Sequence, residues 1–245
     1  MAIESASARR MLILDFDGVL VDTEPIHFES WNRAFEELVN IRVEGDYRQL
    51  VGLTLDEIYK HWAGRLELNT DLKTQLLVRK TELFFTLGAG QLKPMPGSID
   101  LLREAHARGW YTAVASRSKR LRLLRTLDLV QMPALFDVVL GTEDGVDLQT
   151  DRKNHARAGK VFGIEAANCV VVEDSVSGVV DAVACGIGRV IGFARALDRD
   201  ALLAAGAHEV VEQLSDVQLT PPPNPLPEFK EGESENTEKG ASVNG

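Results

Sequence analysis

The 245-residue sequence has few cysteines, no excess of basic side chains and no long apolar run. Its two cysteines, Cys169 and Cys185, both lie in apolar stretches and cannot build a disulfide framework, so we expect a reducing, cytoplasmic location. Because 27 basic residues face 37 acidic ones, the net charge of −10 argues against nucleic acid as a partner. No apolar run approaches the roughly 18 residues of a membrane span, so we expect no membrane partner.

Short apolar stretches recur along the rest of the chain. Each is nearly continuous rather than alternating, which is typical of parallel strands covered on both faces. The six predicted strands are Met11–Leu14, Tyr111–Ala115, Phe136–Leu140, Cys169–Val172, Arg189–Phe193 and Glu209–Val211. From residue 97 onward, helical patterns separate them. This order predicts an α/β fold with a doubly wound, Rossmann-like parallel sheet.

Residues 24 to 92 break that order with three helical stretches and no convincing strand. The stretches run from Pro25 to about Val39, onward from the capping box Thr54–Glu57, and from about Asp71 to Leu87. We therefore predict a core domain at residues 1–23 and 93–219, interrupted by an α-helical domain at residues 24–92. Residues 220–245 are rich in proline and then in polar residues, which predicts a disordered tail.

Acidic residues follow two of the predicted strands. Asp15 and Asp17 come directly after Met11–Leu14, and Glu173 and Asp174 follow Cys169–Val172. A turn aspartate and a helix-capping aspartate would also account for Asp15 and Asp17 taken alone, and acidic helix capping would account for Glu173 and Asp174. Because the carboxyl ends of parallel strands meet at one edge of a sheet, we expect Asp15, Asp17 and Asp174 to converge there. An all-oxygen cluster of this kind suits Mg²⁺.

A hydroxyl and a basic run follow the strand Tyr111–Ala115. Ser116, Arg117 and Lys119 could bind an anion such as phosphate, with backbone amides at the start of a helix. A capped helix with a solvated basic turn is the alternative.

The motifs together resemble the haloacid dehalogenase superfamily of phosphotransferases, and within it the β-phosphoglucomutase-like phosphatases. The matching segments are Asp15–Glu24 (DFDGVLVDTE), the strand that ends before Ser116, and Val172–Ser175 with Gly178. The resemblance covers residues 11 to about 215, including the inserted helical domain, which that family calls a cap.

The resemblance implies a role for each matching residue. Asp15 is expected to be the nucleophile that forms an aspartyl-phosphate, and Asp17 the general acid and then the general base. Mg²⁺ would be bound by the Asp15 and Asp174 side chains and the Asp17 backbone carbonyl, with Glu173 in support. Ser116 would donate a hydrogen bond to the phosphoryl group.

One residue departs from the family pattern. The family places a lysine about 24 residues before Glu173, where this chain has Gln149. Arg152 and Lys153 lie close enough in sequence to replace that lysine, and we expect one of them to bind the phosphoryl group; a solvated helix start is the alternative.

Three residues at or next to the helical domain match positions near the family's substrate. They are Thr23, His27 and Lys80, and Lys80 lies on the apolar face of its helix, where a charge is costly unless it reaches water or an anion. A capped turn, a surface histidine and a snorkelling lysine are the alternatives. The mutases carry an arginine at the position of Leu55, which argues against a mutase.

These observations predict a Mg²⁺-dependent phosphatase that hydrolyses a small phosphorylated metabolite, most simply a sugar phosphate. A β-phosphoglucomutase-like mutase and a catalytically silent phosphate-binding protein remain alternatives, the latter because of Gln149. A receiver-type signalling domain also uses an acidic cluster, but it has no inserted helices. The sequence leaves the oligomeric state open.

Overall fold

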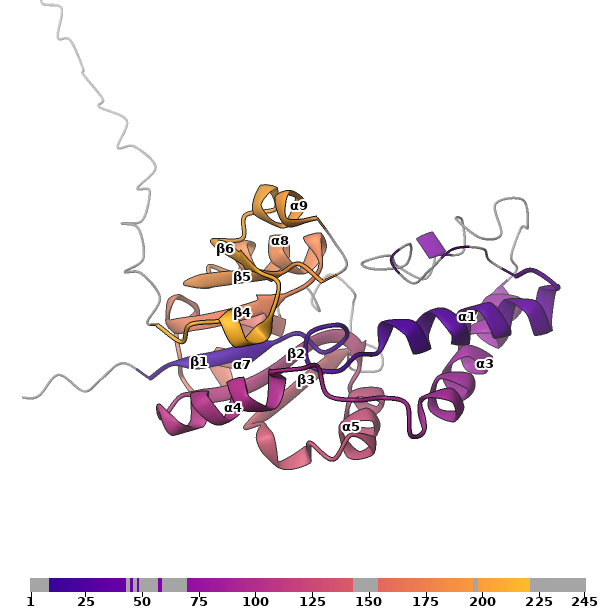
Figure 1. Cartoon of the computed structure of the whole chain (residues 1–245), viewed down its shortest axis with the longest axis horizontal. Coiled ribbons are helices and arrows are strands. Elements are labelled where there is room, and N and C mark those ends of the chain that lie inside the picture. The colour runs from indigo at the N-terminus through magenta and orange to yellow at the C-terminus, as the bar shows by residue number, and fades with distance from the viewer. Residues whose placement is uncertain are drawn as a thin grey trace, which may run out of the picture.

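A computed structural model describes residues 9–42, 45, 48, 57–58, 70–142, 154–195 and 198–220. Its centre is a six-stranded parallel sheet in the order β3-β2-β1-β4-β5-β6 (Figure 1). The strands are β1 (Met11–Leu14), β2 (Tyr111–Lys119), β3 (Val138–Thr142), β4 (Cys169–Glu173), β5 (Arg189–Phe193) and β6 (Glu209–Val211). The predicted α/β fold with a doubly wound sheet is confirmed.

Helices cover both faces of the sheet (Figure 1). In β1, Leu12 and Leu14 pack with α4 (Ser98–Ala107) and α5 (Arg120–Leu129) on one face. Met11 and Ile13 point the other way, as alternation along a strand requires, toward α7 (Asn154–Val161), α8 (Val176–Ala184) and α9 (Arg199–Ala204). Two apolar layers therefore bury the sheet, and its polar residues are confined to the strand ends.

The register of the central strands decides which residues lie next to one another at the carboxyl edge of the sheet. Leu14 of β1 lies beside Val114 of β2 and Val172 of β4. The backbone N–H of Asp15 still donates to the carbonyl of Val172, at 3.0 Å. The residues that follow these strands therefore emerge side by side.

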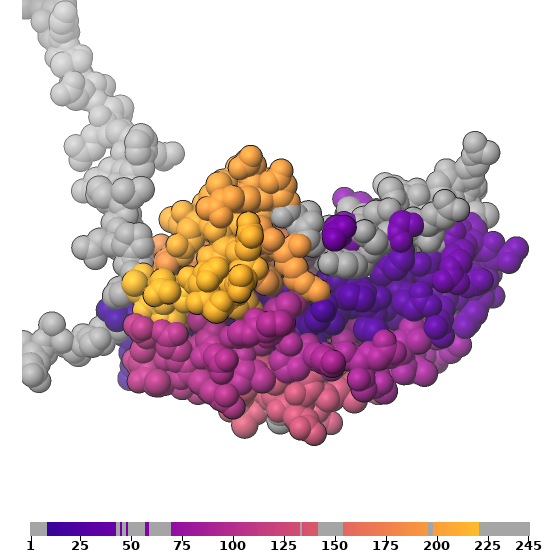
Figure 2. All heavy atoms as spheres, in the orientation of Figure 1, coloured from indigo at the N-terminus to yellow at the C-terminus, as the bar shows by residue number. Residues whose placement is uncertain are grey.

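Between β1 and α4, two of the described helices form a separate lobe, which we call the helical lobe. They are α1 (Glu24–Val39) and α3 (Thr70–Gly88), which lie at one end of the molecule (Figure 2). Their apolar faces enclose a cluster of their own, with Trp31, Phe35, Leu76 and Leu83 among its buried residues. Both helices match the sequence prediction to within one residue at each end.

Part of the helical prediction lies outside the described residues. Of the stretch that starts at Thr54, only Glu57 and Ile58 are described; both are helical, and Ile58 is buried in the same cluster. The predicted boundaries of the inserted domain stay a prediction. The predicted tail also lies outside, apart from Thr220.

Three predicted strands have different bounds in the structure. β2 continues past Ala115 to Lys119, with an irregular register between these residues. β3 runs from Val138 to Thr142 rather than from Phe136 to Leu140, and β4 ends one residue later than predicted, at Glu173. The segment Ser116–Lys119 was predicted to open a helix, which was wrong, because it still pairs with β3 and α5 starts only at Arg120. Within the described ranges, no helix has both the length and the apolar character needed to cross a membrane.

Candidate active site

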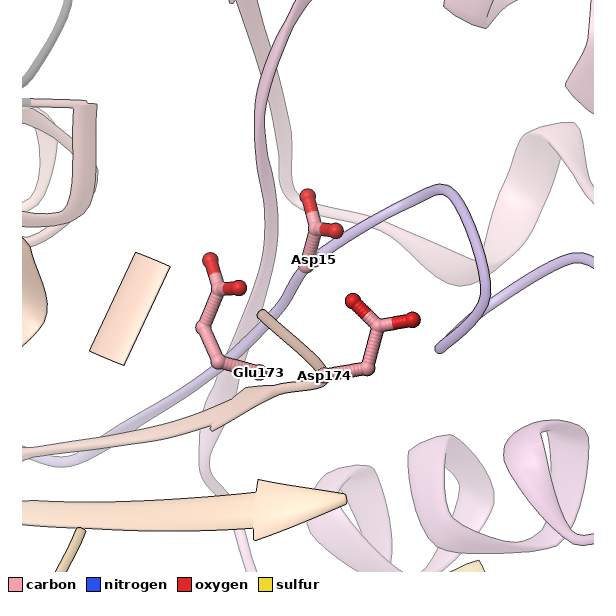
Figure 3. A group of neighbouring side chains, drawn as sticks. All are labelled: Asp15, Glu173 and Asp174. Carbon is pink, nitrogen blue, oxygen red and sulfur yellow. The ribbon is translucent and has the colours of Figure 1, made fainter. Parts of the chain in front are cut away.

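Three carboxylates converge at the carboxyl edge of the sheet. Asp15 follows β1, Glu173 ends β4 and Asp174 comes next (Figure 3). One oxygen from each lies within 4.8 Å of the others. The predicted convergence of the two acidic segments is therefore confirmed for these side chains.

Two glycines make room for this cluster. A Cβ atom on Gly18 would lie 2.1 Å from Asp174 Oδ2, and one on Gly178 would lie 2.0 Å from Glu173 Oε2. Gly18 also has a φ of 83°, a conformation that other residues adopt at a cost. Ser175 caps α8 by accepting a hydrogen bond from the Gly178 N–H, at 3.0 Å. The turns are thus built around the carboxylates.

The cluster is electrostatically strained. Burial raises the pKa of Asp15 well above its ordinary value, and the nearby Glu173, Asp174 and Asp17 raise it further. The pKa of Asp174 is also raised, by burial and then by Glu24 and Glu173. A divalent cation would offset this repulsion, and a set of carboxylate oxygens suits Mg²⁺. The residues present therefore fit the metal that the sequence predicted.

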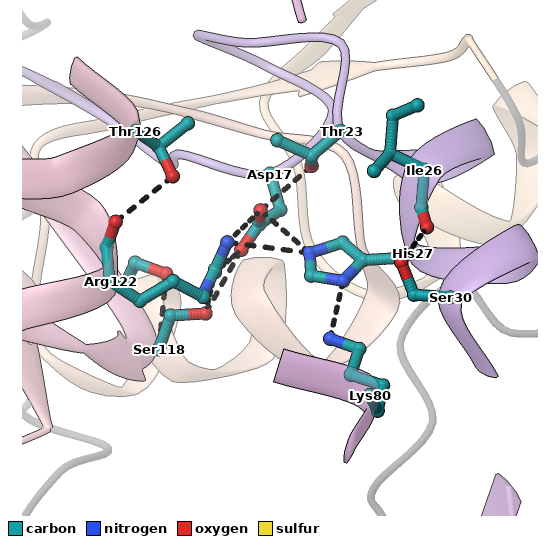
Figure 4. A network of polar contacts seen from close by, with 10 residues as sticks. Asp17, Thr23, Ile26, His27, Ser30, Lys80, Ser118, Arg122 and Thr126 are labelled. Carbon is teal, nitrogen blue, oxygen red and sulfur yellow. Dashed lines mark hydrogen bonds and ion pairs between the residues drawn. The ribbon is translucent and has the colours of Figure 1, made fainter. Parts of the chain in front are cut away.

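The side chain of Asp17 belongs to a different network, between the sheet edge and the helical lobe (Figure 4). Its Oδ1 accepts from Thr23 Oγ1 at 2.7 Å, from Arg122 Nη1 at 3.0 Å, and contacts His27 Nε2 at 3.2 Å. Its Oδ2 accepts from Ser118 Oγ at 3.0 Å and from Arg122 Nη2. Thr23 precedes α1, but its side chain does not cap that helix; the hydroxyl donates to Asp17 instead.

This network fixes the charges around Asp17. Burial alone would raise the pKa of Asp17, but Arg122 and His27 hold it well below its ordinary value. The pKa of His27 falls to about 3, because of burial and then of Lys80, so its ring is neutral near pH 7. Lys80 Nζ lies 2.6 Å from His27 Nδ1. A protonated Lys80 can only donate, which leaves Nε2–H of the neutral ring to donate to Asp17.

Lys80 lies on the apolar face of α3 and is buried, with 8% of its surface exposed, and its predicted role toward the substrate stays a prediction. Its Nζ lies over the rings of Trp31 and Phe84, at 5.4 and 5.3 Å from their centroids. Burial, and then Arg122, lowers the pKa of Lys80 to about 7 from an ordinary 10.5.

We expect Lys80→Met to stabilise the fold at pH 6 by up to about 5 kcal/mol, because the pKa of Lys80 falls from 10.5 to about 7 on folding and each pKa unit corresponds to ~1.4 kcal/mol. Between pH 7 and 10.5 the unfolded chain keeps a proton on Lys80 that the folded chain releases, so wild-type stability rises with pH there. The advantage of the variant should fade by pH 9.5. Urea unfolding at both pH values, with Lys73→Met on the same helix as control, tests this; a pH-independent difference contradicts it.

The predicted phosphate-binding residues are placed unevenly. Ser116 is buried on β2, the strand that pairs with β1. Its Oγ accepts from the Ser118 N–H at 3.2 Å, and its carbonyl accepts from Asn154 Nδ2 at 3.0 Å. Arg117 and Lys119 are exposed, and their predicted role in phosphate binding stays a prediction. Gln149, Arg152 and Lys153 lie outside the described residues, so the replacement of the missing lysine stays a prediction.

The structure adds four residues that the sequence analysis missed. Arg122 and Ser118 bind Asp17, and buried His155 contacts Glu173 Oε1 at 3.0 Å through Nε2. Burial, and then Asp17, raises the pKa of Glu24 to about 7, so it belongs to the same electrostatic environment. Arg122 was one of several basic residues after Ser116, and nothing in their spacing distinguished it.

Comparison with known proteins agrees with this arrangement. The family model for haloacid dehalogenase-like hydrolases matches residues 12–191. A phosphorylated carbohydrates phosphatase of Thermotoga maritima is 29% identical, over 82% of this chain and 93% of that protein. The fructose-1-phosphate phosphatase of Escherichia coli is 26% identical, over 73% and 94%.

A solved structure shows the same fold. The crystal structure of a putative β-phosphoglucomutase from Thermotoga maritima superposes with a TM-score of 0.67 at 28% identity, covering 82% of this chain and 94% of that one. The family match spans both acidic segments and most of the sheet. The chain with this carboxylate cluster is therefore an enzyme of the haloacid dehalogenase-like hydrolase family.

Proposed function

We propose that this chain is a Mg²⁺-dependent phosphatase that hydrolyses a small phosphorylated metabolite, specifically a sugar phosphate, through an aspartyl-phosphate on Asp15. The observation that carries the proposal is the convergence of Asp15, Glu173 and Asp174 at the sheet edge, next to Asp17. The relatives named as phosphatases of phosphorylated carbohydrates and of fructose 1-phosphate support the substrate class. The two free cysteines accord with a cytoplasmic location, which is part of the proposal.

The metal would be held by the carboxylates of Asp15 and Asp174 and the backbone carbonyl of Asp17. Glu173 would support them from behind, held by His155. When bound, Mg²⁺ would neutralise charge on the phosphoryl oxygens.

In the first step, a carboxylate oxygen of Asp15 attacks the phosphorus of the substrate. A bond forms between that oxygen and phosphorus, and the bond to the leaving oxygen of the sugar breaks. Asp17, which Arg122 and His27 keep ionised in this structure, has to take up a proton before this step; it then gives that proton to the leaving oxygen, so that the sugar departs as a neutral alcohol. Ser116 donates a hydrogen bond to the transferred phosphoryl group.

In the second step, the carboxylate of Asp17 takes a proton from water. The resulting hydroxide attacks phosphorus, the bond to Asp15 breaks, and inorganic phosphate leaves. Asp15 is regenerated as a carboxylate and Asp17 as an acid, ready for the next cycle.

A phosphate-release assay over a panel of phosphorylated metabolites, with and without Mg²⁺, tests the function. We expect Mg²⁺-dependent release of inorganic phosphate from at least one sugar phosphate. Interconversion of hexose phosphates without release would replace the proposal by a mutase. Binding of the compounds without turnover would replace it by a silent phosphate-binding protein.

We expect Asp174→Ala to abolish Mg²⁺ binding, because Asp15 would be the one carboxylate left to bind the metal directly, which makes a poor site. In the absence of metal the variant should unfold at a higher temperature than wild type, because a carboxylate with a raised pKa destabilises the fold when ionised. Calorimetric titration with Mg²⁺ and thermal unfolding measure both. Asp100→Ala is the control, since that side chain is 84% exposed on α4; wild-type Mg²⁺ affinity in Asp174→Ala would contradict the proposed metal site.

A further inference from the structure

Arg122 occupies a position between the sheet edge and the helical lobe. It lies in the first turn of α5, and only 12% of its side chain is exposed. Its guanidinium lies over the rings of Phe16 and Phe84, at 5.6 and 5.4 Å from their centroids. The group is thus held between the loop after β1 and helix α3 of the lobe (Figure 4).

In this structure Arg122 binds the carboxylate of Asp17. Its two terminal nitrogens each contact one oxygen of that carboxylate, and Thr23, His27 and Ser118 take the remaining acceptor positions. Five contacts fill a carboxylate that offers about four lone-pair positions. Asp17 can therefore meet a leaving oxygen or a water only after a partner has left it.

Among the described side chains that bind Asp17, Arg122 is the one with a full positive charge, so it would pair with another anion on leaving Asp17. Its Nη1 lies 3.4 Å from His27 Nε2, whose ring bridges toward Lys80. Arg122 and Lys80 both lie against the ring of Phe84. Across the part of the chain that the structure describes, Asp17 is the one carboxylate in ion-pair contact with Arg122. This side of the site is basic, whereas the side of Asp15, Glu173 and Asp174 is acidic.

From this arrangement we propose that Arg122 is a specificity residue that binds a second anionic group of the substrate, a carboxylate or a second phosphate. The proposal rests on the proposed function and narrows its substrate class to phosphate monoesters that carry a second anionic group. The phosphoryl group to be cleaved lies at Asp15, and the second anion draws Arg122 off Asp17. Such a substrate thereby frees the carboxylate that must meet the leaving oxygen.

Binding to the Asp15→Asn protein tests this site without turnover. The probes are two matched pairs: glucose 6-phosphate with 6-phosphogluconate, and fructose 1-phosphate with fructose 1,6-bisphosphate. The second member of each pair adds a carboxylate or a phosphate, so the two pairs separate the two anion sources. Calorimetry is done with Arg122 intact, with Arg122→Met and with the control Arg125→Met, which changes an exposed arginine of the same helix.

In at least one pair, we expect the compound with the added carboxylate or phosphate to bind about ten times more tightly than the other when Arg122 is present. Arg122→Met should abolish that ratio, because a charge-assisted bidentate contact is lost, and Arg125→Met should keep it. A ratio near one with Arg122 intact overturns the proposal. So does an equal loss of affinity for both members in Arg122→Met, which would mean that Arg122 only supports Asp17.

The same proteins with Asp15 restored separate this site from the hydrolase mechanism. If Arg122 discriminates the pairs in binding but no compound releases phosphate, the second-anion site stands and the proposed function fails. If phosphate is released at rates that ignore the second anion, the function stands and the proposal about Arg122 fails.

Discussion

Replacing Asp15 by asparagine is expected to lower phosphate release by at least about 10⁴-fold, a loss in the range found when a nucleophile is removed from other enzymes. The amide has the same shape but cannot form the bond to phosphorus, so covalent catalysis is lost. The variant should fold, and should unfold at a higher temperature than wild type without metal. Burial and three neighbouring carboxylates raise the pKa of Asp15, so its ionised form costs stability at neutral pH.

Two measurements separate the loss of catalysis in Asp15→Asn from its effect on stability. Steady-state phosphate release measures the first, and thermal unfolding in a chelating buffer measures the second. Asp100→Asn on α4 provides the exposed control. An Asp15→Asn enzyme with near wild-type turnover would remove Asp15 from the mechanism, whatever its stability.

Asp17→Asn is expected to slow the hydrolysis of a sugar phosphate by roughly 10²–10⁴-fold, the contribution typical of general acid–base catalysis. The asparagine side chain can neither protonate the leaving oxygen nor activate water. Because the proposed metal contact of Asp17 is through its backbone, Mg²⁺ affinity should remain close to wild type.

The leaving group distinguishes the two roles of Asp17. A p-nitrophenolate leaves without a proton, so Asp17→Asn should still be phosphorylated by p-nitrophenyl phosphate and then stall, giving a burst of one p-nitrophenol per site. Rapid-mixing absorbance measures the burst. A variant that shows wild-type turnover on a sugar phosphate would exclude Asp17 as the acid and base.

The sequence was sufficient for the parts of the molecule that depend on local patterns. Continuous apolar runs such as Met11–Leu14 are typical of inner parallel strands buried on both faces, and the structure confirms this strand. The convergence of Asp15 with Asp174 followed from parallel strand direction, which fixes where strand ends meet. Buried Lys80 followed from the period of its helix.

The remaining features depend on tertiary packing. Arg122 binds Asp17 because α5 starts only after β2 has run on to Lys119, a boundary that the apolar pattern did not mark. His155 meets Glu173 across the edge of the sheet, from the first turn of α7. Such contacts join residues far apart in sequence, so no local sequence pattern predicts them.

Trapping the phosphoenzyme tests the central claim most directly. Asp17→Asn, with its second step slowed, is mixed with radiolabelled acetyl phosphate and Mg²⁺, quenched in acid, digested and mapped by mass spectrometry. The account predicts one acid-stable, hydroxylamine-sensitive phosphoryl group on the peptide that contains Asp15, and none when Asp15→Asn is added. Label on any other residue, or label that persists in the double variant, would contradict it.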